Sequence, residues 1–133
     1  MKLTRRSEYA LLALTYLGRA ATEEWAPLGR IAEAQAIPLR YLEHIVAAMC
    51  RAGYLVSSKG QHGGYRLARK PSEITIAEVI RLFDGALAPV ESVSKYFYQA
   101  TPIERETKML AVLGNIRDYV ARTLEGTTLA DIL

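Results

Sequence analysis

The 133-residue chain can bury one hydrophobic core, since half of its residues are apolar and fewer than a quarter are charged. Its single cysteine, Cys50, excludes an internal disulfide, and no Cys-x-x-Cys or His-x-x-x-His spacing offers a local metal site. This cysteine usage fits a cytoplasmic location, and no apolar stretch is long enough to suggest a membrane span.

Charge is distributed unevenly along the chain. Residues 1–70 carry eleven Lys and Arg against five Asp and Glu, a formal balance of +6, whereas residues 71–133 carry six against nine, a balance of −3. A basic half predicts a polyanionic partner for that part of the protein.

The first 36 residues predict two helices. Thr4 is expected to cap a helix over residues 3–19, because threonine is a common N-cap and the run from Tyr9 to Leu17 is apolar on nearly all sides. Pro27 is expected to open a second helix that ends near Ala36. If Ala36 is left-handed, its side chain costs roughly 1 kcal/mol there relative to glycine.

A third helix is expected to begin at Pro38, only about three residues after the second, which is the spacing of a helix-turn-helix. Its apolar residues recur at helical intervals and predict one buried face: Leu42, Ile45, Val46 and Met49. Its other face carries Arg40, Glu43, His44 and Ala47. Cys50 is expected to be a core residue rather than a redox sensor.

Two short strands, residues 54–58 and 65–68, are expected around the glycine-rich loop 59–64, which gives a β-wing. A capping box formed by Thr75 and Glu78 predicts a fourth helix that ends at Gly85.

The C-terminal part is expected to contain a linker or sensor loop, residues 86–101, and then a long helix. Thr101 and Glu104 form a second capping-box pattern, so this helix is expected to run from there to about Leu124, a length of roughly 35 Å. The fold class is thus mainly α with a small β-wing. Its expected parts are a winged helix-turn-helix domain (1–85), the loop (86–101) and a dimerisation helix with a C-terminal tail (102–133).

This arrangement favours binding to duplex DNA, because the second helix of a helix-turn-helix fits the major groove and a cationic wing reaches phosphates or the minor groove. A solvated helix face or a plain turn would explain either element alone; the two in succession favour DNA. The expected DNA-contacting residues are Lys2, Thr4, Arg5, Arg6, Pro38, Leu39, Arg40, Tyr41, Glu43, His44, Ser57, Ser58, Lys59, Gly60, Gln61, His62, Gly63, Gly64, Tyr65 and Arg66.

Several stretches resemble a known family: residues 1–4 (MKLT), 8–11 (EYAL), 31–32 (IA), 37–43 (IPLRYLE), 63–67 (GGYRL) and 128–131 (TLAD). They are similar to the IscR/NsrR/CymR family of regulators, the Rrf-two family, over essentially the whole chain. The resemblance implies a dimeric winged-helix repressor or activator that binds a palindromic operator, with no enzymatic activity.

The resemblance also implies that the long C-terminal helix pairs with its twin. An apolar stripe wider than one small domain readily covers supports this independently; the alternative is that the helix packs only within its own chain. The expected dimer interface consists of Met109, Leu110, Val112, Leu113, Ile116, Tyr119 and Val120.

The sequence departs from the family in the loop where many relatives hold an iron-sulfur cluster with three cysteines. Ser92 and Thr101 stand where relatives have cysteine, and hydroxyls are poor ligands for iron. Near the N-terminus Glu8 matches a ligand position of other relatives, but Leu12 replaces the histidine needed beside it. We therefore expect no cluster and no metal cofactor.

Two alternatives remain for how a signal is received. The aromatic residues Tyr96, Phe97 and Tyr98 line an effector pocket, or they are plain packing. Alternatively, the loop 86–101 binds a metabolic enzyme or an effector, and this partner controls DNA binding. An enzyme is the weakest class, because neither histidine, His44 or His62, has a nucleophile motif or paired carboxylates around it.

Overall fold

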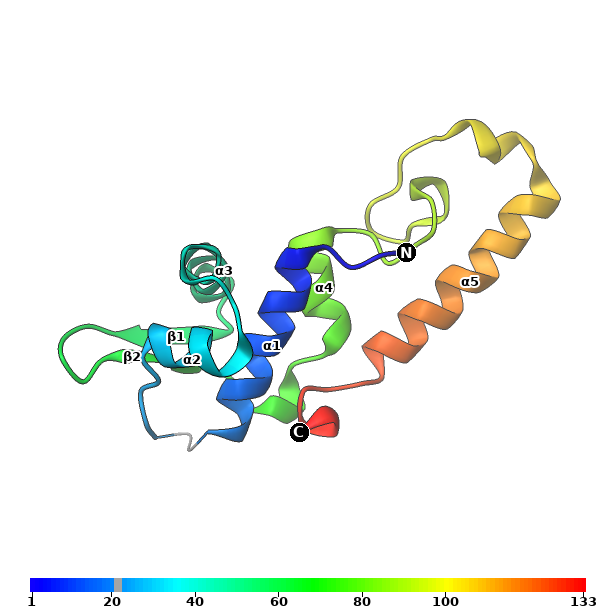
Figure 1. The fold of residues 1–133 in the computed structure, drawn as a ribbon. Coiled ribbons are helices and arrows are strands. Elements are labelled where there is room, and N and C mark those ends of the chain that lie inside the picture. The colour runs from blue at the N-terminus through cyan, green and yellow to red at the C-terminus, as the bar shows by residue number, and fades with distance from the viewer. Residues whose placement is uncertain (21–22) are drawn as a thin grey trace.

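A computed structural model describes residues 1–20 and 23–133. These residues form five α-helices and one two-stranded sheet, arranged as in Figure 1, which confirms the mainly α fold with a small β-wing. The elements in chain order are α1 (Arg5–Arg19), α2 (Leu28–Gln35), α3 (Leu39–Arg51), β1 (Leu55–Ser58), β2 (Gly64–Leu67), α4 (Ile76–Asp84) and α5 (Thr107–Glu125). Short 3₁₀ turns lie at Pro71–Glu73, Glu91–Val93, Pro102–Arg105 and Ala130–Ile132.

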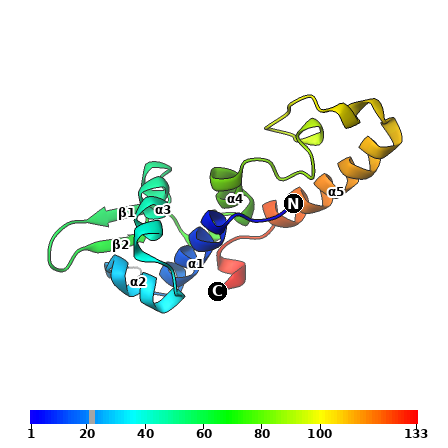
Figure 2. The same cartoon turned by 45° about the horizontal axis from the view of Figure 1, so that its top comes forward.

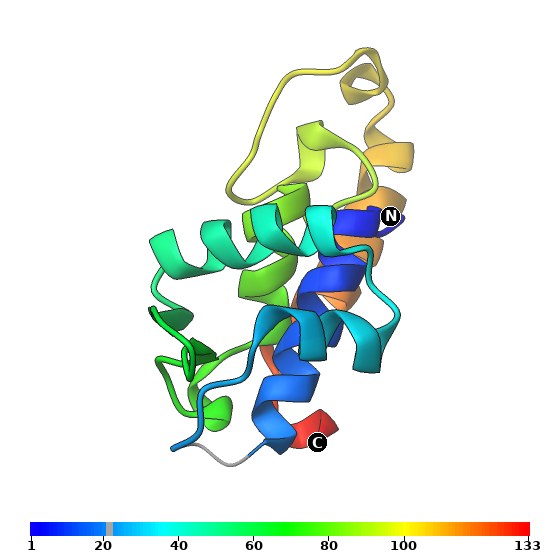
Figure 3. The same cartoon turned by 60° about the vertical axis from the view of Figure 1, so that its left-hand side comes forward.

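Helix α1 is the centre of the core, in contact with α2, α3 and α4. Its alanine and leucine side chains face three directions, and Ala10, Ala13 and Leu14 have no exposed surface. Thr4 caps the helix as predicted, because its hydroxyl accepts a hydrogen bond from the amide of Ser7 at 3.3 Å. Figure 3 shows α2 and α3 crossing the same side of α1.

The helix-turn-helix forms as the sequence predicts. Ala36 ends α2 in the left-handed conformation, with φ 53° and ψ 44°, and the amide of Ile37 donates to the carbonyl of Ala32 at 2.9 Å. Pro38 then caps α3. The predicted buried face of α3 is confirmed for all four residues: Leu42, Ile45, Val46 and Met49.

The wing is an antiparallel hairpin in which Leu55 pairs with Leu67 and Ser58 with Gly64. The residues just before α2 add an isolated β-bridge to the hairpin, since Ala26 and Tyr65 exchange backbone hydrogen bonds of 2.9 and 2.8 Å. This close pairing requires Gly64, because a Cβ atom there would lie 2.2 Å from the carbonyl oxygen of Ala26. The wing is therefore fixed to the body through β2, next to its glycine-rich loop.

The long helix starts later than the sequence predicts. The Thr101 hydroxyl donates to Ser92 Oγ at 2.7 Å, and the Glu104 carboxylate accepts a hydrogen bond from Tyr98, so neither side chain closes a capping box. Residues 102–105 form a 3₁₀ turn instead, and α5 begins at Thr107. Its 19 residues span about 28 Å rather than 35 Å.

Residues 127–133 follow the long helix in the sequence and pack back against the winged domain. The amide of Ile76 donates to the carbonyl of Thr127 at 2.9 Å, and the amide of Leu129 donates to Ile74 at 2.8 Å. Leu129 is fully buried in the same core as α1. In Figures 1 and 2 α5 therefore leaves and rejoins the body, with the wing at the opposite end of the molecule.

Candidate nucleic-acid interface

The outer face of α3 is exposed along its first two turns. Arg40, Tyr41, Glu43 and His44 all lie on this face, opposite the buried residues. The Arg40 guanidinium stacks on Tyr41, 5.0 Å from the ring centroid, and the Arg40 side chain also donates to the Tyr41 hydroxyl at 3.3 Å. Among the residues that the structure describes, neither Arg40 nor Glu43 forms an ion pair. Both charges are thus available to an external partner.

The start of α1 places two more arginines beside α3. Arg5 forms an exposed ion pair with Glu8 at 2.7 Å, and the Arg6 guanidinium lies 5.3 Å from the ring centroid of Phe83. Lys2, also expected at DNA, is exposed just before them. This end of α1 is cationic and offers free backbone amides, a combination that favours phosphate.

Thr4 has a structural partner that sequence reasoning missed. Its amide donates to Asp84 Oδ2 at 3.1 Å, and its hydroxyl donates to the other carboxylate oxygen. Partial burial raises the pKa of Asp84, but the hydrogen bonds from Thr4 and the charge of Arg6 lower it more, so this pKa lies below its usual value. Thr4 therefore ties the start of α1 to the end of α4.

The wing presents its tip and part of its strands to solvent. Ser57, Lys59, Gly60, Gln61 and His62 are exposed, whereas Ser58, Gly63, Gly64, Tyr65 and Arg66 are half-buried. Tyr65 packs against the core, so its side chain turns away from the tip. Of the predicted wing residues, those at the tip are best placed to reach DNA.

Trp25 is a functional candidate that the sequence reading missed. The Arg66 guanidinium lies 4.1 Å from the centroid of the Trp25 ring, a cation–π contact between β2 and the residues just before α2. Residues 25 and 66 are brought together by the bridge between Ala26 and Tyr65. The only local signal was a tryptophan immediately before the expected second helix.

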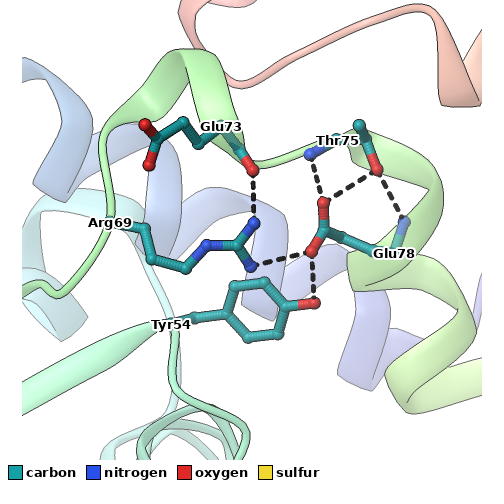
Figure 4. A network of polar contacts seen from close by, with 5 residues as sticks. All are labelled: Tyr54, Arg69, Glu73, Thr75 and Glu78. Carbon is teal, nitrogen blue, oxygen red and sulfur yellow. Dashed lines mark hydrogen bonds and ion pairs between the residues drawn. The ribbon is translucent and has the colours of Figure 1, made fainter.

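A polar network joins the wing to α4 (Figure 4). Glu78 accepts hydrogen bonds of 2.8 Å from Arg69, Tyr54 and the amide of Thr75, and its role in the predicted capping box is confirmed. Partial burial raises the pKa of Glu78, but these donors outweigh it and the pKa is lowered. Burial and the neighbouring Glu78 raise the pKa of Tyr54 to about 12. The network fixes both ends of the hairpin relative to α4.

The loop 86–101 folds back along α5, where Arg117 donates to the carbonyl of Val93 at 2.7 Å. Tyr96, Phe97 and Tyr98 are largely exposed. The hollow beside Tyr96 and Phe97 has a volume of only about 10 Å³, about the least that one water needs. An effector pocket lined by Tyr96, Phe97 and Tyr98 stays a prediction.

Helix α5 has no buried residue. Met109, Val112, Ile116 and Tyr119 are 47, 53, 46 and 67% exposed, and their spacing places them in one stripe. The other three residues of the expected interface, Leu110, Leu113 and Val120, are half-buried, and Val120 packs against the cluster around α4. The expected interface therefore divides into an exposed stripe and an inner row that is partly covered by its own chain.

Cys50 is half-buried against the core, and burial raises the pKa of its thiol although Arg51 opposes the shift. A raised thiol pKa makes the reactive thiolate rarer, which favours the predicted core role over a redox role.

The helix-turn-helix, the wing and the projecting helix define a protein of the winged-helix regulator class. The sequence model of the Rrf2 family, described as iron-dependent transcriptional regulator, matches residues 3–133. The chain therefore belongs to the Rrf2 family of transcriptional regulators, a non-enzymatic class.

Named relatives agree with this assignment. The chain is 32% identical to the HTH-type transcriptional regulator CymR of Bacillus subtilis, over 99% of this chain and 89% of CymR. It is 35% identical to the HTH-type transcriptional regulator NsrR of Geobacillus kaustophilus, over 100% of this chain and 90% of NsrR. The solved structure of CymR, the global cysteine regulator of B. subtilis, superposes with a TM-score of 0.78 at 30% identity and covers 99% of this chain and 95% of CymR. The IscR structure from T. potens superposes with a TM-score of 0.76 at 28% identity and covers 99% of this chain and 85% of IscR.

The iron in the family's description does not fit the residues of this loop. Ser92 and Thr101 offer neutral hydroxyls that hydrogen-bond to each other, and Glu8 is paired with Arg5. No group of three or more His, Cys, Asp or Glu side chains within residues 1–20 and 23–133 is arranged to hold a metal ion. The same part of the chain contains no helix long and apolar enough to cross a bilayer.

Proposed function

We propose that this regulator binds duplex DNA in a sequence-specific manner as a homodimer on a palindromic operator. The observation that carries the proposal is the division of α3 into two faces: a buried row anchors the helix, while Arg40, Glu43 and His44 point outward without ion-pair partners among the described residues. An arginine contacts guanine and a carboxylate accepts from cytosine in the major groove.

Two further cationic elements support a bound duplex. Lys2 and Arg5 at the start of α1 would contact phosphates on one side of α3, and Lys59 at the tip of the wing would contact the backbone on the other. Phosphate contacts of this kind fix the register of the protein on DNA, and base contacts from α3 supply the sequence preference.

The exposed stripe of α5 supports the homodimer. Positions 109, 112, 116 and 119 follow the alternating three- and four-residue spacing of a coiled-coil seam. A second copy of the same helix covers such a stripe by two-fold symmetry, and a two-fold dimer reads two copies of a half-site in inverted orientation. We further propose that the protein acts without an iron-sulfur cluster.

A fluorescence anisotropy titration of the protein against genomic fragments, repeated at several salt concentrations, tests DNA binding. We expect affinity to fall steeply with salt, and at least one palindromic fragment to bind on the order of 10³-fold more tightly than bulk DNA. Equal affinity for all fragments would contradict the proposal. Anaerobically purified protein should show no iron-sulfur absorbance.

A second candidate function is a protein-interaction module. The three largely exposed aromatic residues of loop 86–101 favour it, because exposed aromatic side chains are frequent at protein interfaces. In this alternative, a metabolic enzyme or a small effector held by the loop controls DNA binding. A pull-down that loses its prey when Tyr96 and Tyr98 are changed to serine would support it; retention of the prey would exclude it.

A further inference from the structure

A cleft separates the first turns of α1 from the exposed side of α3. Its volume is about 740 Å³, within the range of about 300–1,000 Å³ that small-molecule sites occupy. Much of its wall is apolar: the rings of Tyr9 and Tyr41 lie 6.4 Å apart at 34°, and Ile45 and Ala47 continue the surface along α3. Two tilted aromatic rings at this distance offer a planar molecule a stacking surface.

The charged side chains of the lining are all cationic. Arg5 and Arg6 come from α1, and Arg51 comes from the last turn of α3, which also contributes the ring of His44 from an earlier turn. No Asp or Glu lines the cleft. Arg5 is paired with Glu8, whereas neither Arg6, whose charge also acts on Asp84, nor Arg51 forms an ion pair among the described residues.

We propose that this α1–α3 cleft binds a small aromatic carboxylate and that the bound ligand competes with DNA. The tyrosine rings would stack on the aromatic body, and an arginine would hold the carboxylate through charge-assisted hydrogen bonds. A phosphate of the DNA backbone alone needs the cations but not the apolar wall, so the wall favours a ligand with an apolar body.

Competition with DNA follows from the residues shared by the two sites, and this part rests on the proposed function. Tyr41, His44, Arg5 and Arg6 line the cleft and are also expected DNA contacts. Arg51 and Ala47 line the cleft without being expected DNA contacts, which allows the two activities to be separated by mutation.

Ligand binding is tested first without DNA, on the full chain, with 1-anilinonaphthalene-8-sulfonate as a fluorescent aromatic anion and 1-naphthoate as competitor. We expect one site per chain, from which 1-naphthoate displaces the probe about tenfold more effectively than uncharged 1-naphthalenemethanol. Ala47→Trp, at an exposed position that fills the cleft, should abolish the signal, and Arg51→Gln should weaken 1-naphthoate about tenfold. Arg30→Gln, outside the cleft on α2, should change nothing.

Probe binding that survives Ala47→Trp, or equal displacement by the charged and uncharged naphthalenes, would overturn the site. A separate titration measures operator affinity with and without 1-naphthoate. We expect the ligand to weaken DNA binding of the wild-type chain, and Arg51→Gln to bind DNA normally but need about tenfold more ligand for the same effect. Unchanged operator affinity with ligand bound would overturn the competition. Failure to bind any DNA would count against the proposed function alone, because the probe titration does not depend on it.

Discussion

Helices α3 and α5 are both amphipathic, yet only α3 has the residues of its apolar face fully buried by its own chain. The apolar face of α3 lies against α1 and the base of the wing, where its four predicted core residues are almost completely inaccessible to solvent. The corresponding stripe of α5 has about half of its surface exposed. The comparison separates two outcomes of one sequence pattern: an apolar face that completes a domain, and an apolar face that stays exposed on the single chain.

The most severe test of this difference is Ile116→Asp in the middle of the exposed stripe. A charge buried at a helix pair without a partner should weaken self-association by about 100-fold or more, and operator affinity should fall with it. Because Ile116 is half-exposed in one chain, the helical circular dichroism of the variant should match the wild type.

Sedimentation equilibrium measures the association of this variant directly. Asn115→Asp is the matched control, since it adds the same charge at the next, exposed position, beside the stripe, and should leave the dimer intact. A wild-type chain that sediments as a monomer, or an Ile116→Asp variant that dimerises normally, would show that α5 is not the contact.

The outer face of α3 is tested by Arg40→Ala. Loss of one base contact worth about 1–3 kcal/mol should lower operator affinity by roughly tenfold or more, with a much smaller loss on non-specific DNA. Arg105→Ala, a similar change in the 3₁₀ turn before α5, should have no effect on either affinity. Equal losses on both kinds of DNA would reassign Arg40 from base recognition to phosphate contact.

The join between the wing and α4 is tested by Glu78→Gln. The amide keeps the shape but removes the charge that Arg69, Tyr54 and Thr75 share, so we expect a loss of about 1–2 kcal/mol in the free energy of unfolding at pH 7. Because the folded-state pKa of Glu78 is lowered, its contribution is fully present above its ordinary pKa of about 4.3 and is lost as the pH falls below it.

Thermal unfolding followed from pH 7 to pH 3 measures this contribution. The difference in Tm between the wild type and Glu78→Gln should be largest near neutrality and shrink in acid. A constant difference across that range would mean that the charge of Glu78 contributes nothing specific to the network.

The smallest expected effect concerns the turn that joins α2 to α3. Ala36→Gly removes a Cβ atom from a left-handed residue and should stabilise the protein by up to about 1 kcal/mol. Ala34→Gly, two residues earlier inside α2, should destabilise it by about 0.5–1 kcal/mol. Chemical denaturation of the two variants therefore tests the direction of each change in the free energy of unfolding as well as its size.

Sequence reasoning succeeded where the deciding contacts are local. The spacing of Leu42, Ile45 and Met49 is enough to orient α3. The capping box at Thr75 forms because Glu78 lies one turn away and keeps one carboxylate oxygen for Thr75, while the other accepts from Arg69 and Tyr54. The same pattern at Thr101 forms no capping box, because the Thr101 side chain hydrogen-bonds to Ser92 and the Glu104 side chain hydrogen-bonds to Tyr98. Those competitors lie outside the four-residue motif, so the motif alone could not reveal them.

The parts of the site that the sequence did not reveal depend on contacts between distant residues. Trp25 meets Arg66 only after the wing has folded against the connection between α1 and α2. The α1–α3 cleft likewise needs the crossing of two helices, which spacing within each helix does not specify. Local periodicity predicts the faces of a helix but not what comes to lie across from them.

The docking of residues 127–133 has a consequence for how the protein is made. Leu129 fills the interior beside α1 and pairs with Ile74, so the winged domain lacks a core side chain until residues far along the chain have left the ribosome. Folding of residues 1–85 during synthesis therefore stops short of the native state. The core of this domain is therefore completed only after α5, which precedes Leu129 in the sequence, has also been made.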